Sequence, residues 1–321
     1  MGRVLVTGGQ GYLGSVLVTA LRAAGTEVVV VDNGLVPGVR LPGVTYVAGD
    51  VSLPGDWRSA LSGVDAVVHL AAVVGDPACA VDEGLSWRVN HVGTVRVAEA
   101  CRRAGVGRLV FASTCSNYGI ADEEVDVDSP LDPISVYART KVRAEQYLLA
   151  TASSALRPCV LRFATVHGLS PRMRFDLAVN VMTADAVRTG RITVHGGAQW
   201  RPFLHVRDAA AAMVRCVSPS AAVPSAVYNC GSHGENYRMT AVAETIAAEV
   251  AGAVVDVRPE LVDRRSYRVR FDRIADELAF TPRFRMADSV REIRDAMAAG
   301  RYADYQAPHY SNYLTAQAAA S

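Results

Sequence analysis

A glycine-rich turn close to the start of the chain restricts the fold more than any other feature. Gly8, Gly11 and Gly14 follow the apolar run Val4–Thr7 and open the amphipathic stretch Tyr12–Ala24. Between a strand and a helix, glycines at this spacing allow a tight turn, close approach of a pyrophosphate and close packing of helix on strand. The free N–H groups at the helix start favour an anion there. The turn therefore predicts the first βα unit of a dinucleotide-binding sheet, with a plain glycine turn as the alternative.

Short apolar runs and longer helical stretches alternate through the rest of the first half. The predicted strands are Val28–Asp32, Val44–Val47, Ala66–Leu70 and Arg108–Ala112, and the predicted long helices are Leu85–Ala104 and Val136–Ala150. Near-continuous apolar strands between helices are typical of a parallel sheet that is covered on both faces. The predicted fold class is therefore α/β, with a doubly wound Rossmann sheet.

Beyond Leu161 the pattern is less regular. The helices predicted there are Met173–Arg188, Arg207–Val217, Met239–Val250, Asp272–Ala279 and Ala287–Ala299. The last stretch, Tyr302–Ser321, is rich in tyrosine and aperiodic, so we expect it to wrap the surface or to be partly disordered.

Charge and hydropathy argue against nucleic-acid and membrane partners. The 33 Lys and Arg residues balance 32 Asp and Glu residues, and no basic stripe stands out. No run of about 18 apolar residues could span a bilayer. The first predicted strand begins so early, at Arg3, that we expect no signal peptide and a cytoplasmic protein.

The six cysteines show neither CxxC pairing nor histidine partners at zinc spacing. They are Cys79, Cys101, Cys115, Cys159, Cys216 and Cys230. We expect small, buried, apolar side chains in a reducing compartment, and no metal site.

Asp32, at the end of the second predicted strand, bears on the choice of cofactor. A carboxylate there can accept hydrogen bonds from the adenosine ribose hydroxyls and would repel a 2′-phosphate. The following Asn33 and Gly34 supply no cation, so the sequence favours NAD over NADP. A strand-end aspartate that caps a turn is the alternative. Asp50, after the third strand, could bind the adenine amino group or be an ordinary loop residue.

Tyr137 and Lys141 lie four residues apart on a predicted helix, so their side chains share one face. The ordinary tyrosine pKa of about 10 is too high for a base at neutral pH, and a nearby ammonium group lowers it. Such a pair can exchange a proton with a substrate hydroxyl while NAD takes a hydride from carbon. A surface tyrosine beside a solvated lysine is the alternative, which the glycine turn disfavours.

Four motifs follow one another in a specific order. They are Gly8-xx-Gly11-xx-Gly14, Leu70-Ala71-Ala72, Ser113-Thr114-Cys115-Ser116-Asn117-Tyr118-Gly119 and Tyr137-xxx-Lys141. Together they resemble those of the extended short-chain dehydrogenase/reductases, the NAD-dependent epimerase/dehydratase family, and the resemblance covers nearly the whole chain. It implies a Rossmann domain joined to a smaller C-terminal α/β domain that binds a nucleotide-diphosphate sugar.

The resemblance also implies roles for individual residues, with Thr114 joining Tyr137 and Lys141 as a catalytic group. The implied cofactor-binding residues are Gly8, Gly11, Tyr12, Leu13, Asp32, Asn33, Asp50, Val51, Leu70, Ala71, Ala72, Asn90, Tyr137 and Lys141. The implied substrate-binding residues are Thr114, Thr165, Asn180, Arg201 and Arg265. The two arginines would bind the diphosphate, since a guanidinium fork suits phosphate oxygens. Arg264 and Arg268 compete with Arg265 for that position.

The same resemblance divides the chain. We predict an NAD-binding domain over residues 1–165, with a returning segment near 203–232, and a substrate domain over residues 166–202 and 233–321. Family members often dimerise through the two long helices, so we expect a homodimer.

Cys115 and Ser116 depart from the family pattern in a way that narrows the chemistry. Similar 4,6-dehydratases carry Asp-Glu at these two positions, and similar decarboxylases tend to carry Glu at the second. Neither cysteine nor serine replaces such a carboxyl at neutral pH. What remains is oxidation, ketone reduction, or epimerisation through a transient ketone. Thr165 and His167 also replace the Asn and Tyr of similar 4-epimerases, which leaves the sugar open.

The leading hypothesis is an NAD-dependent nucleotide-sugar epimerase that acts at C4 of the hexose. A net redox enzyme, either an oxidase or a ketoreductase, is the alternative. A non-catalytic NAD-sensing protein is a third, which the presence of Thr114, Tyr137 and Lys141 disfavours because a sensor has no need of them.

Overall fold

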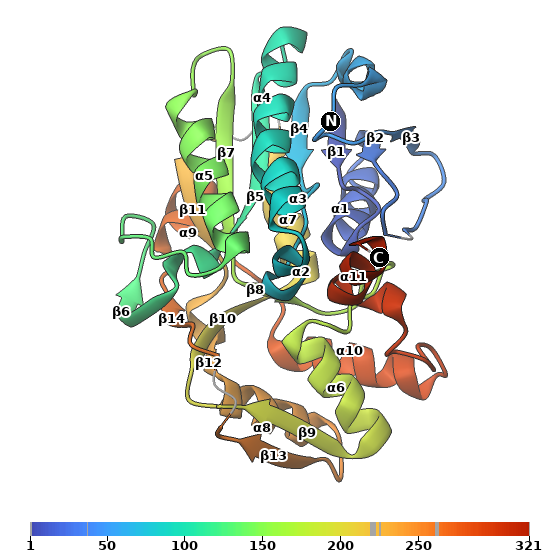
Figure 1. Ribbon diagram of the computed structural model, residues 1–321, viewed down its shortest axis with the longest axis vertical. Coiled ribbons are helices and arrows are strands. Elements are labelled where there is room, and N and C mark those ends of the chain that lie inside the picture. Colours follow the sequence, from blue (N-terminus) through green and yellow to red (C-terminus); the bar gives the residue numbers. More distant parts are fainter. Residues whose placement is uncertain (1, 37, 219–222, 225, 261–262, 321) are drawn as a thin grey trace.

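A seven-stranded sheet forms the upper part of the computed structural model (Figure 1), which describes residues 2–36, 38–218, 223–224, 226–260 and 263–320. The strand order is β11-β7-β5-β4-β1-β2-β3, and all neighbouring strands are parallel. The strands are β1 (Arg3–Thr7), β2 (Glu27–Asp32), β3 (Thr45–Ala48), β4 (Ala66–His69), β5 (Arg108–Thr114), β7 (Arg157–Phe163) and β11 (Ala226–Cys230).

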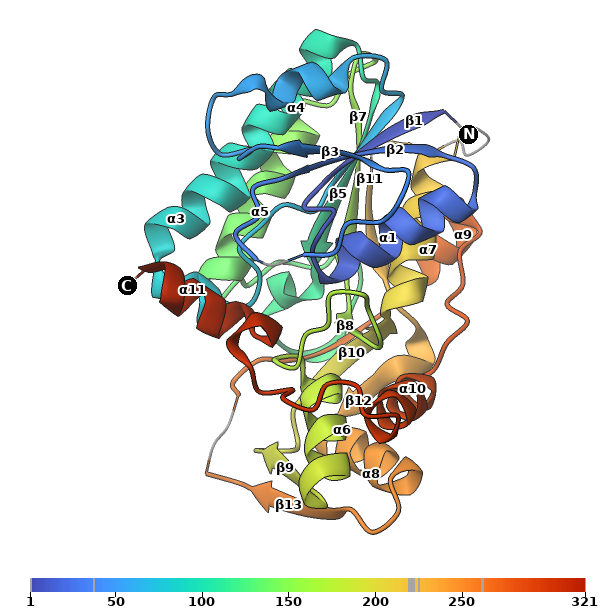
Figure 2. The same ribbon diagram turned by 90° about the vertical axis from the view of Figure 1, so that its right-hand side faces the viewer.

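Helices cover both faces of this sheet (Figure 2). The helices α1 (Tyr12–Ala23) and α7 (Val206–Val217) lie on one face, and α4 (Gly93–Ala104) and α5 (Val136–Ala150) lie on the other. Successive strand side chains alternate between two cores, because Cβ atoms point to opposite faces. Val4 and Val6 pack in the α1 core, whereas Leu5 packs in the α4 core. The predicted doubly wound α/β fold is confirmed.

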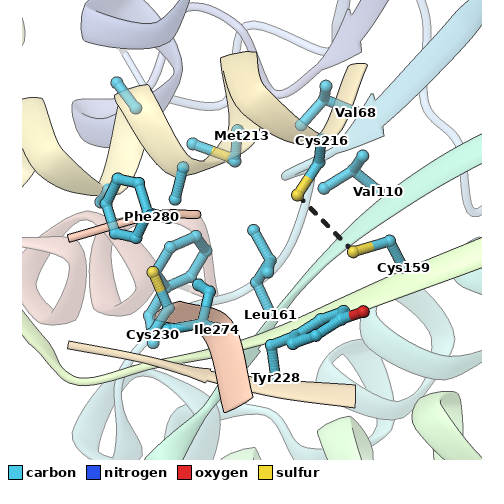
Figure 3. Packing of buried hydrophobic residues seen from close by; sticks show 14 of the residues in the cluster. Val68, Val110, Cys159, Leu161, Met213, Cys216, Tyr228, Cys230, Ile274 and Phe280 are labelled. Carbon is cyan, nitrogen blue, oxygen red and sulfur yellow. Dashed lines mark hydrogen bonds between the residues drawn. The ribbon is translucent and has the colours of Figure 1, made fainter. Parts of the chain in front are cut away.

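Segments that are distant in sequence meet on the α7 side of the sheet (Figure 3). Cys159 on β7 faces Cys216 on α7, with 3.6 Å between their sulfur atoms, and both are free thiols. Leu161 and Tyr228 belong to the same core, as does Ile274 of α9 (Asp272–Leu278). All six cysteines are buried and free, as predicted.

A second core lies below the sheet and is built from residues beyond β8 (Thr165–His167). Its elements are α6 (Ala178–Thr189), β9 (Arg191–His195), β10 (Trp200–His205), β12 (Asn236–Arg238), α8 (Met239–Glu249), β13 (Val254–Arg258) and α10 (Met286–Ala298). The strands form a three-stranded sheet, β12-β10-β8, and a parallel pair, β13-β9. Ile192, Phe203 and Val242 are fully buried between them. This separate core supports the two-domain division, which stays a proposal.

Three predicted elements differ from the structure. The helix predicted over Leu85–Ala104 is divided into α3 (Glu83–Trp87), a π-helical turn (Arg88–Val92) and α4. The helix predicted from Met173 begins only at Ala178. The aperiodic stretch forms a short turn and then α11 (Asn312–Ala320), which packs along α2 (Asp76–Val81), while Ser321 lies outside the described residues.

Across the described part of the chain, no helix combines the length and the apolar character that crossing a membrane requires.

Candidate functional site

The glycine turn has the close packing that its sequence predicts. Gly8 has a φ of +70°, and a Cβ there would lie 2.7 Å from the backbone nitrogen of Ala71. A Cβ on Gly14 would overlap the carbonyl oxygen of Gly8. Side chains at these positions would therefore collide with the backbone of Ala71 and of the turn itself, so only glycine allows the turn to pack this closely before α1. The turn fits the pyrophosphate of a dinucleotide.

Two carboxylates lie where β2 and β3 end. Asp32 accepts hydrogen bonds from the backbone nitrogens of Gln10 (3.1 Å) and Gly34 (3.0 Å). Asp50 accepts one from the nitrogen of Ser52 at 2.8 Å. The bond from Gly34 is the turn-capping role that was the alternative for Asp32, while the bond from Gln10 ties this carboxylate to the glycine turn. The ribose contact of Asp32 and the adenine contact of Asp50 stay predictions.

The side chains of Tyr12 and Asn90 form hydrogen bonds within the protein. The Tyr12 hydroxyl donates to the carbonyl oxygen of Gly168 at 2.6 Å, so a cofactor contact would come from its backbone at the start of α1. The Asn90 amide accepts from the nitrogen of Val73 (2.8 Å) and donates to the carbonyl oxygen of Val73 (3.0 Å) and to the Thr140 hydroxyl (3.1 Å). Asn90 therefore fixes the segment that follows Ala72 against α5.

The catalytic pair predicted from the sequence lies in the first turns of α5. Ser135 caps this helix by accepting a hydrogen bond from the nitrogen of Ala138 at 3.1 Å. The buried Lys141 ammonium donates to the carbonyl oxygen of Ala112 at 2.9 Å and lies 5.8 Å from the centre of the Tyr137 ring. Ala112 is two residues before Thr114 on β5, so the helix holds both side chains beside the strand that carries Thr114.

The expected lowering of the Tyr137 pKa by Lys141 is wrong for the protein alone. Burial raises the pKa of Tyr137, since the phenolate is poorly solvated there. Burial also lowers the pKa of Lys141 to about 8. Low polarity disfavours the charged form of each group, and burial is the largest cause of both pKa shifts.

Thr114 ends β5 and lies in a chain of hydroxyl groups. It accepts a hydrogen bond from the nitrogen of Ser116 at 3.0 Å, and its hydroxyl lies 3.1 Å from that of Ser116. The Ser116 hydroxyl in turn lies 3.4 Å from that of Tyr267. Tyr267 belongs to β14 (Ser266–Val269), which pairs with β6 (Ile120–Val125). Sequence reasoning missed Tyr267, although it follows Arg265 by two residues.

A buried ionic network beneath Thr114 was also missed. Glu145, one turn after Lys141 on α5, accepts from Asn117 at 2.8 Å and from Arg162 at 2.8 Å, and also binds Ser113. Arg162 and Glu145 are both buried. The network connects α5 to β5 and β7, so it sets the position of Lys141 relative to Thr114. The isolated sequence positions carry no signal of this pairing.

The two predicted diphosphate ligands, Arg201 and Arg265, meet around one shared carboxylate, that of Asp263. Arg201 on β10 forms an ion pair with Asp263 at 2.9 Å. Arg265 binds Asp263 and also Asp76 of α2. Asp76 accepts a hydrogen bond from Ser135, the cap of α5, at 2.7 Å. Arg265 is therefore linked to the start of α5 through Asp76.

The structure distinguishes Arg265 from Arg264 and Arg268, the other two candidates for the diphosphate position. Arg268 lies over the Trp200 ring at 5.5 Å, and Arg264 is exposed. Thr165 begins β8 opposite Phe203, two residues after Arg201 on β10. Among the ion pairs of the described residues, Arg265 is the one of the three arginines that shares a carboxylate with Arg201.

Asn180 differs from the other predicted substrate ligands because its amide is fully used inside the protein. It accepts from the nitrogen of Gly168 at 3.0 Å and donates to the carbonyl oxygen of Arg174 at 2.9 Å and to Tyr12 at 3.3 Å. It is completely buried. A substrate contact by Asn180 would require one of these bonds to break.

No group of three or more histidine, cysteine or carboxylate side chains that could hold a metal ion occurs within the described ranges.

Comparisons with known proteins place the chain in a family. The chain is 33% identical to the UDP-glucose 4-epimerase of Azospirillum brasilense, over 92% of this chain and 91% of that protein. It is 30% identical to the dTDP-glucose 4,6-dehydratase of Streptomyces niveus, over 90% of this chain and 91% of that protein. The solved structure of Thermus thermophilus UDP-glucose 4-epimerase with NAD superposes with a TM-score of 0.79 at 28% identity, covering 92% of this chain and 99% of that one. The model of the NAD-dependent epimerase/dehydratase family matches residues 4–231. This chain therefore belongs to the NAD-dependent epimerase/dehydratase family.

Proposed function

We propose that this protein is an NAD-dependent nucleotide-sugar epimerase that inverts C4 of a hexose. The observation that carries the proposal is the presence of Thr114, Tyr137 and Lys141 without acid and base groups at the two positions after Thr114. Cys115 is buried and donates to the carbonyl oxygen of Arg162 at 3.2 Å, and burial raises the pKa of its thiol. Ser116 offers only a hydroxyl. Elimination of water needs an acid and a base that these residues do not supply.

The proposed reaction needs only groups that the site contains. NAD supplies a hydride acceptor that takes hydrogen from C4 and returns it. Tyr137 removes the proton of the C4 hydroxyl and later gives it back, while the Thr114 hydroxyl donates to the same sugar oxygen. Lys141, held by the carbonyl oxygen of Ala112, provides positive charge near the Tyr137 ring. Arg201 and Arg265 bind the diphosphate so that the sugar can turn over without leaving.

The nature of the relatives supports nucleotide sugars as the substrate class. An epimerase of UDP-glucose and a dehydratase of dTDP-glucose both match over about nine-tenths of the chain. We therefore expect a pyrimidine-nucleotide hexose, and UDP-glucose is the first compound to test.

An isotope experiment distinguishes epimerisation from the alternatives. UDP-glucose and dTDP-glucose carrying deuterium at C4 are incubated with the enzyme and NAD, and the products are identified by NMR. Epimerisation keeps the deuterium at C4 of a product with inverted configuration. Deuterium that collects in free NADH would instead establish net oxidation, and loss of water from the sugar would establish dehydration. If the protein binds NAD but converts no member of a wide nucleotide-sugar panel, the result would favour the alternative of a non-catalytic NAD-sensing protein.

We also infer that the protein is a homodimer. The two long helical stretches of the first half leave apolar Val92 and Leu149 exposed, at 37% and 36% of their surface. The inference rests on the family resemblance, since members often associate through these two stretches, and a symmetric dimer would cover both side chains. Sedimentation at micromolar concentration should give twice the mass of the 34.2 kDa chain, and a monomer would overturn the inference.

A further inference from the structure

Arg172 is a buried arginine, and two nitrogen atoms of its guanidinium group form no hydrogen bond with the rest of the described chain. It lies in the segment between β8 and α6, and only 5% of its surface is exposed. Its Nε and Nη2 atoms have no hydrogen-bond partner within the described ranges. Most buried polar groups in native proteins are hydrogen-bonded, so unpaired donors of this kind call for an explanation.

The neighbouring Arg174 provides an internal comparison. It is buried to a similar degree, yet its guanidinium donates to both carboxylate oxygens of Asp176, at 2.8 and 3.0 Å. Burial, with the charge of Arg174, lowers the pKa of Arg172 to about 10 against a smaller opposing effect of Asp176, which leaves Arg172 charged at neutral pH without an ion pair of its own among the described residues. An unpaired buried charge opposes folding. The chain thus carries an unfavourable group where an apolar side chain of similar length would be more stable.

The segment that carries Arg172 is attached to the start of α1. Ser170 donates to the carbonyl oxygen of Tyr12 at 2.7 Å, and its hydroxyl lies 3.0 Å from that of Ser15. The backbone nitrogen of Arg172 donates to the Ser170 hydroxyl at 3.3 Å. Tyr12 and Ser15 belong to the first turns of α1, directly after the glycine turn. The first turn of α1 carries no acidic residue that could pair with Arg172.

We propose that Arg172 binds the diphosphate of a bound nucleotide, and that this nucleotide is the cofactor. Nε and a terminal nitrogen of a guanidinium can donate side by side to two oxygens of a phosphate. The start of α1 supplies backbone N–H groups for the same anion. The dinucleotide is then held by the segment before α6 as well as by the Rossmann sheet. The inference rests on the use of NAD and is independent of which reaction follows.

The substrate diphosphate has the same chemistry and is the other possible source of this anion. Arg201 and Arg265 already serve that group in the proposed function. Arg172 is instead connected through Ser170 to the helix at the glycine turn. The connection favours the cofactor, and the two sources are separated by binding measurements that involve no turnover.

Binding to nucleotide-free protein tests the proposal. Calorimetric titrations of wild type and Arg172→Met with ADP-ribose, which contains the cofactor diphosphate, should show affinity about 10- to 100-fold weaker in the variant. Affinity for UDP-glucose should be unchanged. If UDP-glucose binding falls while ADP-ribose binding stays, Arg172 serves the substrate and the cofactor assignment is overturned. Unchanged affinity for both would overturn the proposal altogether.

Thermal unfolding of the same proteins provides a second, independent readout. Without nucleotide, Arg172→Met should unfold at the same temperature as wild type or higher, because it removes an unpaired buried charge. Arg174→Met, the matched control, should unfold at a lower temperature because Asp176 loses its arginine partner. A large loss of stability in Arg172→Met alone would mean that Arg172 has a structural partner, against the proposal. Arg172→Lys keeps the charge without the fork, and it should also weaken ADP-ribose binding.

Discussion

At the scale of single residues, Tyr137 and Lys141 show how burial changes the chemistry of a familiar pair. Both side chains lose favourable hydration, so the pKa of the phenol rises and that of the ammonium falls. The Lys141 ammonium group also donates a hydrogen bond to the carbonyl oxygen of Ala112. Burial therefore favours the uncharged form of both side chains.

The tyrosine hydroxyl is the group on which the proposed reaction depends most. Tyr137→Phe should lower turnover by about 10²–10⁴-fold, the usual contribution of a general acid–base group, while NAD binding persists. Tyr147→Phe is the matched control, because it removes a hydroxyl from the same helix that donates to Glu99 at 2.7 Å. Steady-state kinetics and an NAD titration check both variants. Full activity in Tyr137→Phe would contradict the assignment of Tyr137 as the general acid–base group.

The charge of Lys141 predicts a pH dependence. With a pKa of about 8 in the folded protein, against an ordinary value of 10.5, Lys141 is charged below pH 8 and neutral above it. The kcat/KM of the enzyme should therefore fall above about pH 8, since this parameter follows ionisations of the free protein. The same shift makes Lys141 oppose folding below pH 8, and this effect fades between pH 8 and 10.5.

Lys141→Arg tests whether Lys141 causes the fall of kcat/KM above about pH 8. An arginine stays charged over the whole range, so an active variant should lose the fall above about pH 8. If the kcat/KM of the variant still falls above about pH 8, another group causes that fall.

At the scale of elements, Asp76 of α2 connects three parts of the site. It accepts from Ser135 at the start of α5 and pairs with Arg265 from the segment before β14. Arg265 and Arg201 share Asp263, whose burial opposes ionisation but whose two arginine partners hold its pKa at about 2. Carboxylates thus pair with both arginines.

The diphosphate role of this arginine pair can be tested on the β10 side. Arg201→Ala should weaken UDP-glucose binding by roughly 1.5–3 kcal/mol, the range for a hydrogen bond to a charged group, and leave NAD affinity unchanged. Asp263 keeps Arg265 as a partner in this variant. Arg258→Ala, which breaks a pair with Asp256 on β13, is the control and should change neither affinity. Weaker NAD binding with normal UDP-glucose binding would move Arg201 to the cofactor site.

At the scale of the whole molecule, two buried histidines set a limit on acid stability. His69, between the hydroxyls of Thr7 and Thr94, and His167 beside Ser289 are both about 1% exposed. Burial lowers the pKa of each from 6.5 to about 3, helped by the charge of Lys141 for His69 and by His205 for His167. The folded protein therefore takes up fewer protons than the unfolded chain below pH 6.5.

The free energy of unfolding should consequently fall as the pH drops below about 6.5. Each histidine contributes a slope that approaches about 1.4 kcal/mol per pH unit and continues towards about pH 3. Urea unfolding at about pH 7.5, 6.0 and 5.0 measures the slope, and His167→Gln should reduce it by one histidine. The same change at exposed His309 is the control. A variant slope equal to that of wild type would show that His167 is not held neutral.

Local patterns in the sequence determined the elements whose signals are contained within a few residues. The helix predicted over Val136–Ala150 has those bounds in the structure, because Ser135 caps it and its apolar face repeats at helical spacing. The glycine turn followed from the steric needs of a strand–turn–helix unit alone. The same applies to the shared face of Tyr137 and Lys141, which depends only on helix geometry.

Only the tertiary structure decided features that depend on partners distant in sequence. The segment before Ala178 is not helical, since the nitrogen of Phe175 donates to the carbonyl oxygen of Tyr310. The helix α11 forms against α2 although its own sequence has no clear apolar face. Arg265 is distinguished from Arg264 and Arg268 by carboxylates from elsewhere in the chain. The direction of the Tyr137 pKa shift likewise follows from burial, which the sequence alone does not reveal. Local spacing in the sequence encodes periodicity and helix caps. Solvent exclusion and ion pairing arise only when distant parts of the chain pack together.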